Sequence, residues 1–191
     1  DTALPTVGIQ KLDDRNLHAD PNSRQEFLRQ SAAIVSQLKN HPSICCWTIF
    51  NEAWGQFDSD NVYEWFRGLD DTRFIDSTSG WFRQKKSDVD SRHVYFRKVK
   101  LKGDGKLPLV LSEFGGKTCT TPEELNRAVR SLYLEEVLPC IGKGLCAAIY
   151  TQVSDVEDEI NGLVTYDRKV VKLQAETMLP VAAELQKAIE E

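Results

Sequence analysis

The stretch SICCWTIFNE (residues 43–52) decides the fold, and LPLVLSE (residues 107–113) follows the same pattern. Each is an apolar run that stops at a glutamate, Glu52 in the first and Glu113 in the second. Nearly unbroken apolar runs, without polar alternation, are typical of strands covered on both faces in a parallel sheet. A third run, LCAAIY (residues 145–150), has the same character. We therefore expect three buried parallel strands, two of which carry an acid at the tip.

Segments with helical periodicity lie between and after these runs. Residues 22–39 place apolar side chains on one face, behind Asn22 and Ser23 as cap-type residues. Residues 121–139 open with the order T-P-E-E, a capping box with proline at the first helical position. Residues 170–189 form a last amphipathic stretch. The alternation of strand and helix predicts an α/β fold built from right-handed βαβ units.

The length of the chain argues for a part of a larger barrel. At 191 residues the chain can bury one good core, so we expect a single domain over residues 1–191. A complete (β/α)8 barrel usually needs about 250 residues. The chain has no initiator methionine, and residues 1–20 resemble a loop cut from something longer. We therefore expect a truncated chain whose N-terminal barrel half lies elsewhere.

Charge, hydropathy and cysteine content bear on the partners and the compartment of the chain. The net charge of -5 is spread along the chain, and acids interrupt its one basic stretch, so we expect no nucleic-acid partner. We find no long apolar stretch and expect no membrane span. Five cysteines are an odd number, and Cys45, Cys46 and Cys146 lie inside predicted buried strands, which favours a reducing compartment such as the cytoplasm. We expect no cofactor and no metal.

Three motifs give the chain a resemblance to a known family. The segments are HPSICCWTIFNEAW (residues 41–54), LDDTRFIDSTSGW (residues 69–81) and VLSEFGG (residues 110–116). In this order and spacing they resemble family 2 of the glycoside hydrolases, the group of β-galactosidase, β-glucuronidase and β-mannosidase. The resemblance extends from about residue 22 to residue 175.

The resemblance implies a partial (β/α)8 TIM barrel, roughly strands four to eight with outer helices. By this comparison Asn51 and Glu52 end strand four, and residues 71–81 run into strand five. His93 and Tyr95 would end strand six. Ser112 and Glu113 would end strand seven, and the run at residues 145–150 would be strand eight.

The resemblance also implies retaining hydrolysis of terminal β-glycosidic bonds by two glutamates. Glu52 would be the acid/base and Glu113 the nucleophile, and such a pair needs a separation of about 5 to 5.5 Å. These residues are far apart in sequence, so only a tertiary fold that gathers strand ends on one face can pair them. We expect the carbohydrate to be the substrate partner.

Five further residues are expected to bind the substrate or to support the nucleophile. By the same resemblance, Asn51 would hydrogen-bond the sugar 2-hydroxyl, and Tyr95 would donate to Glu113 and keep it ionised and aimed. Trp54 and Tyr150 are candidate aromatic walls for a sugar face. His93 is a further candidate of this kind.

The sequence says less about the sugar. Asn161, Gly162 and Leu163 stand where β-glucuronidases carry an Asn-x-Lys, which counts against glucuronides and leaves a neutral β-galactoside as the default. A non-catalytic carbohydrate-binding or scaffold domain stays open as an alternative. A doubly wound nucleotide-binding module is disfavoured, because no GxGxxG or P-loop follows any strand.

The missing barrel half has a consequence for association. Strands four to eight alone would expose an unpaired edge at each end, which invites a partner copy or another cover. We therefore expect the isolated chain to be inactive, with exposed edges that allow a homo-oligomer to form. Residues 97–107 are short and glycine-rich, so we expect that crossover to be irregular.

Overall fold

The computed structural model describes residues 13–18, 20–116, 119 and 121–190. Of the loop expected over residues 1–20, residues 1–12 and 19 therefore lie outside the described residues. The chain divides into two compact units, Asp1–Ser91 and Arg92–Glu191, which we describe one at a time.

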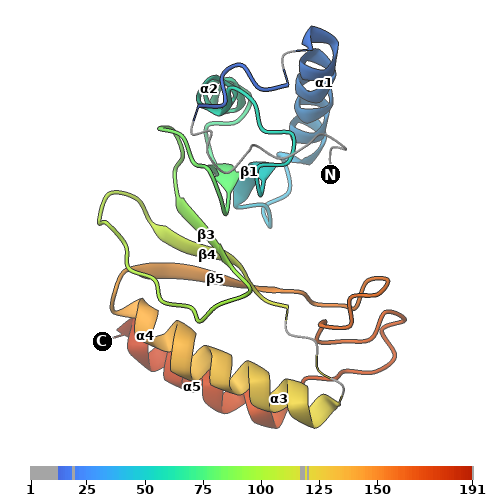
Figure 1. The fold of residues 1–191 in the computed structure, drawn as a ribbon, viewed down its shortest axis with the longest axis vertical. Coiled ribbons are helices and arrows are strands. Elements are labelled where there is room, and N and C mark those ends of the chain that lie inside the picture. Colours follow the sequence, from blue (N-terminus) through green and yellow to red (C-terminus); the bar gives the residue numbers. More distant parts are fainter. Residues whose placement is uncertain (1–12, 19, 117–118, 120, 191) are drawn as a thin grey trace. The chain divides into compact units, whose positions relative to one another are not determined.

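The first unit alternates helices with two parallel strands (Figure 1). Its elements, in chain order, are α1 (Pro21–Leu38), β1 (Cys46–Asn51), α2 (Ser59–Leu69) and β2 (Phe74–Ser79). β1 and β2 pair in parallel from Cys46 opposite Phe74 to Asn51 opposite Ser79. The predicted parallel α/β arrangement is thus confirmed here.

α1 begins earlier than predicted. Its cap is Asp20, whose carboxylate accepts from the Ser23 backbone N–H at 2.7 Å, so the prediction of Asn22 and Ser23 as caps is wrong. The reason is Pro21, which has no N–H to satisfy and a backbone angle already suited to the first helical position. On the inner face of the helix, Phe27 stacks on Phe50 of β1 at 5.2 Å between ring centroids.

A buried ion pair joins the start of β2 to the turn before β1. Asp70 accepts from Trp47 Nε1, Thr72 and Arg73, each at 2.9 Å or less. Arg73 in turn donates to the carbonyls of residues 39, 41 and 44, which form the turn between α1 and β1. The hydrogen bonds from Thr72 and Trp47, with the nearby Arg73 guanidinium, hold the pKa of Asp70 well below its ordinary value. This network fixes where β1 starts and hence where its tip falls.

The last four residues of β2 are buried although their side chains are polar. Asp76, Ser77, Thr78 and Ser79 are each at most 4% exposed. Polar groups are kept in an interior only where they are hydrogen-bonded or where function requires them. A polar strand of this kind has no apolar signal in the sequence, and hydrophobic patterning therefore does not find it.

The second unit is a sheet with helices packed on one face (Figure 1). The sheet order is β3 (Asp90–Val94), β4 (Leu109–Gly115) and β5 (Leu145–Thr151), with β4 and β5 parallel. The helical elements are α3 (Pro122–Ser131), a π-helical turn η1 (Leu132–Val137), α4 (Leu138–Ile141) and α5 (Ala175–Glu190). Thr121 caps α3 through the backbone N–H of Glu124, which confirms the predicted start. Residues 97–107 form no helix, as predicted.

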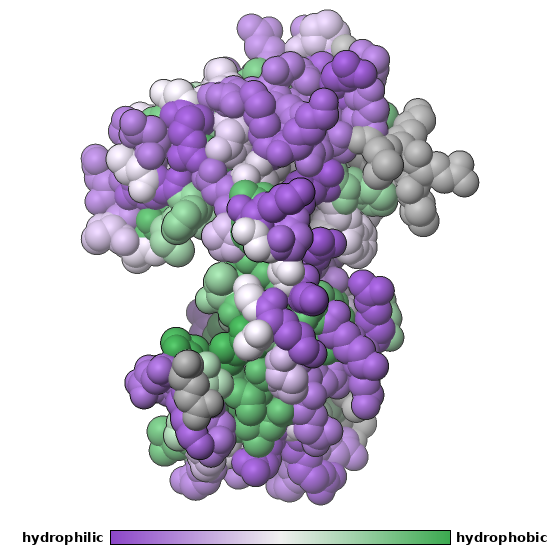
Figure 2. All heavy atoms as spheres, turned by 90° about the vertical axis from the view of Figure 1, so that its left-hand side faces the viewer, coloured by the Kyte–Doolittle hydropathy of each residue, from purple (hydrophilic) through white to green (hydrophobic). Residues whose placement is uncertain are grey.

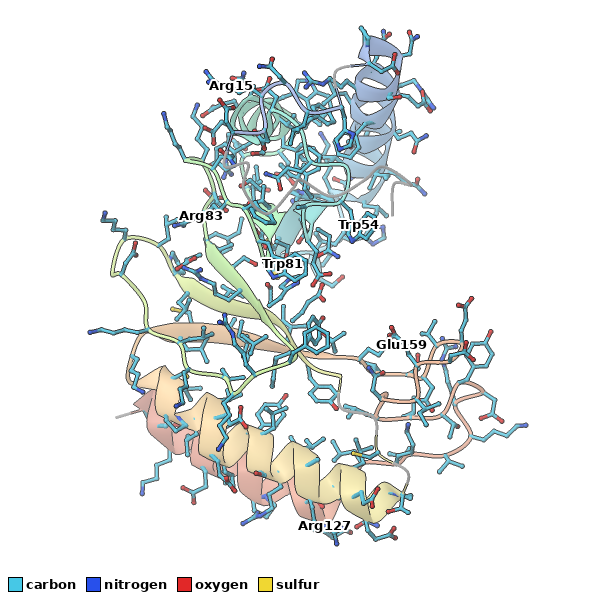
Figure 3. The ribbon with its side chains drawn as sticks, viewed as in Figure 1. Arg15, Trp54, Trp81, Arg83, Arg127 and Glu159 are labelled. Atoms are coloured by element: carbon cyan, nitrogen blue, oxygen red, sulfur yellow. The ribbon has the colours of Figure 1, made fainter. Side chains whose placement is uncertain are left out.

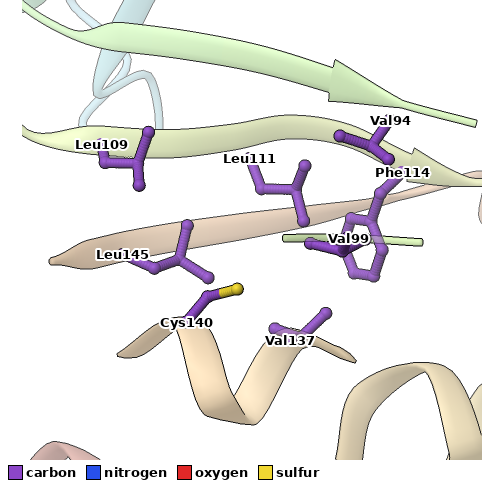
Figure 4. Close-up of a cluster of buried hydrophobic side chains, with 8 residues drawn as sticks. All are labelled: Val94, Val99, Leu109, Leu111, Phe114, Val137, Cys140 and Leu145. Carbon is purple, nitrogen blue, oxygen red and sulfur yellow. The ribbon is translucent and has the colours of Figure 1, made fainter. Parts of the chain in front are cut away.

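The core of the second unit lies between this sheet and the helices (Figure 4). Leu111 and Phe114 of β4 are fully buried there, against Val137 of η1 and Cys140 of α4. The prediction that all three apolar runs are covered on both faces is wrong: β4 buries one face and leaves the other half-buried, β1 leaves Thr48 exposed, and β5 is the most exposed of the three. β5 is the last strand of the described sheet, and its Ile149 is 57% exposed.

Apolar side chains accordingly reach the surface of the second unit (Figure 2). The thiols follow the same trend, because Cys45 and Cys146 are exposed and the expectation that they are buried is wrong. Cys46 is half-buried, and all five thiols are free. Within the described part of the chain, none of the helices combines the length and hydrophobicity needed to cross a membrane.

Candidate active site

Residues 51–58, which we call the acid loop, begin at the last residue of β1 and carry Glu52. Asn51 is the last residue of β1, and the N–H of Glu52 continues the strand ladder by donating to the Ser79 carbonyl at 3.0 Å. At Glu52 and Ala53 the backbone adopts the left-handed conformation, with φ of 50° and 65° respectively. Such conformations cost non-glycine residues about 1 to 3 kcal/mol each and gather at functional sites. The strain therefore indicates that the direction of the Glu52 side chain is constrained.

Two tryptophans lie in the loops that follow β1 and β2 (Figure 3). Trp54 belongs to the acid loop and is 46% exposed, while Trp81 follows β2 and is 41% exposed. Large aromatic rings kept at the surface offer a flat apolar face to a ligand. The position of Trp54 is compatible with the predicted sugar wall. Trp81 has the same character, although the sequence analysis did not select it.

Glu113 lies in a β-bulge of β4. Leu111 pairs with Ala148 and Phe114 pairs with Tyr150, so three steps along β4 match two along β5. In a regular strand, residues 111 and 113 would point to one face. The extra residue lets Leu111 and Phe114 both enter the core and turns Glu113 to the other face. Bulges occur next to active sites because they redirect a side chain in this way.

Two ring side chains from the end of β3 flank the Glu113 carboxylate. The Tyr95 hydroxyl donates to Glu113 Oε2. His93 Nδ1 lies 3.6 Å from the same oxygen, and the imidazole is fully buried. The structure thus brings Tyr95 and His93 together with Glu113, as expected for Tyr95. Because the His93 side chain has no exposed surface, the structure favours a contact with the carboxylate over one with a ligand.

We predict a loss of activity when this hydroxyl is removed. In the full-length protein, Tyr95→Phe should lower kcat on an aryl β-glycoside by about 10²-fold, the usual effect of deleting one hydrogen bond to a reacting group. Tyr166→Phe makes the same change on a tyrosine that is 71% exposed and should leave kcat unaltered. Equal rates for the two variants would contradict a role of Tyr95 at the nucleophile.

Tyr150 packs over the backbone next to Glu113. A Cβ at Gly115 would come within 2.6 Å of Tyr150 Cε2, so the ring lies directly on this glycine. The ring also meets Phe114 edge to face at 5.8 Å between centroids. Burial raises the pKa of Tyr150 to about 12, so its hydroxyl stays protonated at neutral pH. Through these contacts Tyr150 supports the end of β4. Its contact with a sugar stays a prediction.

Gly115 is a site residue that the sequence analysis missed, and it should tolerate no side chain. Its φ is 105°, so Gly115→Ala adds backbone strain to the clash with Tyr150. We predict a loss of about 3 kcal/mol in the free energy of unfolding. Gly105 also has a positive φ, of 74°, but open space around its Cβ position. Gly105→Ala should cost about 1 kcal/mol, and a similar cost at both positions would show that the Tyr150 contact is unimportant.

The predicted residues therefore fall into two described groups. Asn51, Glu52 and Trp54 lie at and just after the end of β1 in the first unit, and the others lie around Glu113 in the second unit. The convergence of Glu52 on Glu113 stays a prediction.

Parallel strands followed by helices, with acids at the carboxyl ends of strands, are the arrangement of α/β-barrel proteins. The chain belongs to the glycosyl hydrolases of family 2, because the model of that family's TIM barrel domain matches residues 3–127. This confirms the predicted family.

Individual relatives agree with the family match. The chain is 28% identical over 86 residues to a β-galactosidase of Yersinia enterocolitica, and 26% identical over 86 residues to one of Vibrio vulnificus. Each match covers 45% of this chain and 8% of the relative.

Solved structures show the same fold. An exo-β-1,4-mannosidase from Opitutaceae bacterium strain TAV5 matches with a TM-score of 0.60 at 18% identity, over 95% of this chain and 44% of that one. A β-glucuronidase of Bacteroides uniformis matches with a TM-score of 0.58 at 17% identity, over 78% of this chain and 24% of that one. The chain thus spans less than half the length of these relatives.

Proposed function

We propose that this chain forms the C-terminal part of the catalytic barrel of a retaining β-glycosidase. β1 to β5 would be barrel strands four to eight, and the rest of the barrel would cover the outer edges of β1 and β5. Glu113 would be the nucleophile and Glu52 the acid/base. Residues 1–191 alone would be inactive, because a closed barrel would be needed to bind the sugar between the two acids.

The observation that carries this proposal is the bulge at Glu113. It places a carboxylate outside the core, under the hydroxyl of Tyr95, at a strand position where side-chain alternation predicts a buried residue. A carboxylate that is aimed by a tyrosine and not paired with a lysine or arginine in any described contact suits attack on a carbon centre better than a structural ion pair. The strained backbone at Glu52 supports a second functional acid.

The chemistry follows from the roles of the two acids. Glu52 gives a proton to the glycosidic oxygen while Glu113 attacks the anomeric carbon, which forms a glycosyl ester and releases the alcohol. Water, deprotonated by Glu52, then cleaves the ester. Asn51 would bind the sugar 2-hydroxyl, and Trp54 would cover one face of the sugar or of the leaving group.

A terminal β-galactoside is the proposed substrate. The relatives from Yersinia enterocolitica and Vibrio vulnificus are β-galactosidases, although each match covers a small part of the relative. The segment after β5 carries Leu163 and no cation in the stretch 161–163, which is unsuited to a sugar carboxylate. Galactosides are therefore favoured over glucuronides.

The proposal is tested on the full-length protein with matched aryl β-galactosides, β-glucuronides and β-mannosides. We expect the galactoside to be cleaved fastest and the first sugar product to keep its β configuration, as seen by proton NMR. A 2-deoxy-2-fluoro glycoside with a dinitrophenyl leaving group should label the peptide that contains Glu113. An α product would overturn the retaining mechanism, and binding without cleavage would favour a non-catalytic carbohydrate-binding domain.

A further inference from the structure

The acid loop is tied at two points, once to the last residue of β2 and once to the loop that follows β2. At its start, the Glu52 N–H donates to the Ser79 carbonyl at 3.0 Å. Near its end, Gln56 Nε2 donates to the Phe82 carbonyl at 3.1 Å and to Asp14 Oδ2 at 2.8 Å. One amide nitrogen with two N–H groups thus joins three segments that are far apart in sequence.

The strained part of the acid loop lies between these two ties. Glu52 and Ala53 are left-handed, and Ala53 is completely buried. Short turns fill the space between, since the Trp54 N–H donates to the Asn51 carbonyl at 2.9 Å and the Gln56 N–H lies 3.4 Å from the Ala53 carbonyl. Strained residues persist only where their surroundings over-determine them. If the second tie were lost, this pair could relax, and the Glu52 carboxyl would change direction.

The carboxylate that receives Gln56 is itself held in place. Asp14 is 2% exposed, and its carboxylate also accepts from the Ser59 N–H at 3.2 Å. The carbonyl of Asp14 accepts from the Asp58 N–H at 3.0 Å. Asp14 therefore caps α2, because the side chain of the N-cap residue Asp58 accepts no capping hydrogen bond from the helix backbone. Gln56 is anchored to the rigid start of a helix.

Gln56 cannot reach a ligand, because it is fully buried. Its Oε1 finds no hydrogen-bond partner among the described residues, which is an unfavourable arrangement for a buried amide. Buried polar atoms without a hydrogen-bond partner are expected where function requires a particular geometry. An apolar side chain of the same length would fill the space without this cost, but it would not hold the two loops together.

We propose that Gln56 is a positioning residue for Glu52, which it directs by tying the acid loop to Asp14 and Phe82. This inference rests on the proposed function, in which Glu52 protonates the leaving oxygen. Its signature is therefore a defect in acid catalysis. A leaving group that departs without a proton hides such a defect, and one that needs a proton reveals it.

The test compares Gln56→Met with the unmodified full-length enzyme on two β-glycosides of the same hexose. The 2,4-dinitrophenyl glycoside should lose less than about threefold in kcat/KM, because its leaving group needs no acid. The phenyl glycoside should lose on the order of 10²-fold, the effect of a misplaced catalytic group. Rates are divided by the number of sites that the 2-deoxy-2-fluoro dinitrophenyl glycoside labels, so loss of folded protein cancels.

Gln84 supplies a matched control. Its Nε2 also donates to the Phe82 carbonyl, at 3.0 Å, but it has no described bond to the acid loop. Gln84→Met therefore removes a hydrogen bond to the same acceptor and should leave the ratio of the two rates unchanged.

Each outcome decides the inference. An equal loss on both glycosides, or no loss on either, overturns the positioning role. If Gln56→Met gives no labelled sites, Asp14→Asn is measured in the same way, since it removes the charge that strengthens the tie, and we expect a phenyl-selective loss of about tenfold. An unchanged rate ratio, or no labelled sites in this variant too, also overturns the positioning role. If the unmodified enzyme neither cleaves nor is labelled, the proposed function itself fails.

Discussion

Glu113→Gln in the full-length protein is expected to lower kcat on aryl β-glycosides by on the order of 10⁴-fold or more, because covalent catalysis cannot begin without the nucleophile. The amide is nearly the same size and can still accept from Tyr95, so the bulge and the core beneath it should be preserved. The loss should be similar for good and poor leaving groups. Initial rates of phenolate release measure it, and circular dichroism checks the fold.

Glu52→Gln is the matched comparison within the same experiment. It removes the acid and leaves the nucleophile, so dinitrophenyl glycosides should still form the glycosyl ester while phenyl glycosides react slowly. Added azide, which needs no general base to attack the ester, should restore turnover in this variant. If Glu113→Gln kept more than about a tenth of the activity, the assignment of the nucleophile would be wrong.

Asp70→Asn is expected to destabilise the first unit by about 3 kcal/mol, because it leaves a mostly buried guanidinium without its counter-charge. The side chain of Asp70 is 4% exposed and that of Arg73 is 14% exposed. The new amide would also turn a donor toward Trp47 or Thr72, which are donors themselves. Hydrogen exchange of peptides from β1 and β2 measures the loss inside the longer protein, and we expect about 100-fold faster exchange.

Asp71 provides the control, since it is an exposed acid one residue further on. Asp71→Asn should change the stability by less than about 0.5 kcal/mol. The comparison also decides which acid of the LDDTR segment is structural, and equal effects would contradict the role of Asp70.

The effect of Asp70 should depend on pH with a definite sign. Its pKa is lowered by folding, so its stabilisation is complete above the unfolded value near 3.8 and disappears as the pH falls through the folded value. The difference in exchange between Asp70→Asn and the unmodified protein should therefore be full at pH 7 and smaller at about pH 3. A difference that grows on acidification would show that the carboxylate is not the stabilising form.

The strands that hydrophobic patterning predicted are those with apolar side chains. β1, β4 and β5 follow the three apolar runs, and α1, α3 and α5 overlap the predicted helical stretches, although the predicted cap of α1 was wrong and α2 lies outside those stretches. β2 was reached only through the family resemblance, because its residues 76–79 are polar although buried. Local patterning assumes that polar residues face water, and the interior of this fold does not obey that rule.

The part of the candidate site that could be predicted from the sequence is the pair of acids at the ends of strands. Glu52 and Glu113 stand next to apolar runs, so the sequence alone selects them. The roles of Gly115 and Gln56 depend on Tyr150, Asp14 and other residues distant in sequence, and no spacing rule relates them. The exposure of Ile149 could not be predicted either, because it depends on which strand lies beyond β5.

The irregular register at Glu113 has a consequence for how this strand can change over time. Because Leu111 and Phe114 are both interior, removing Ser112 between them would restore regular alternation, which keeps both side chains inside and Glu113 outside but abolishes the bulge that aims the carboxylate. Substitutions on either side can alter the direction of the carboxylate in small steps, whereas a change in length at this point either keeps the bulge or removes it. The spacing of the strand, more than the identity of its apolar residues, therefore constrains which descendants of this gene can keep a working carboxylate.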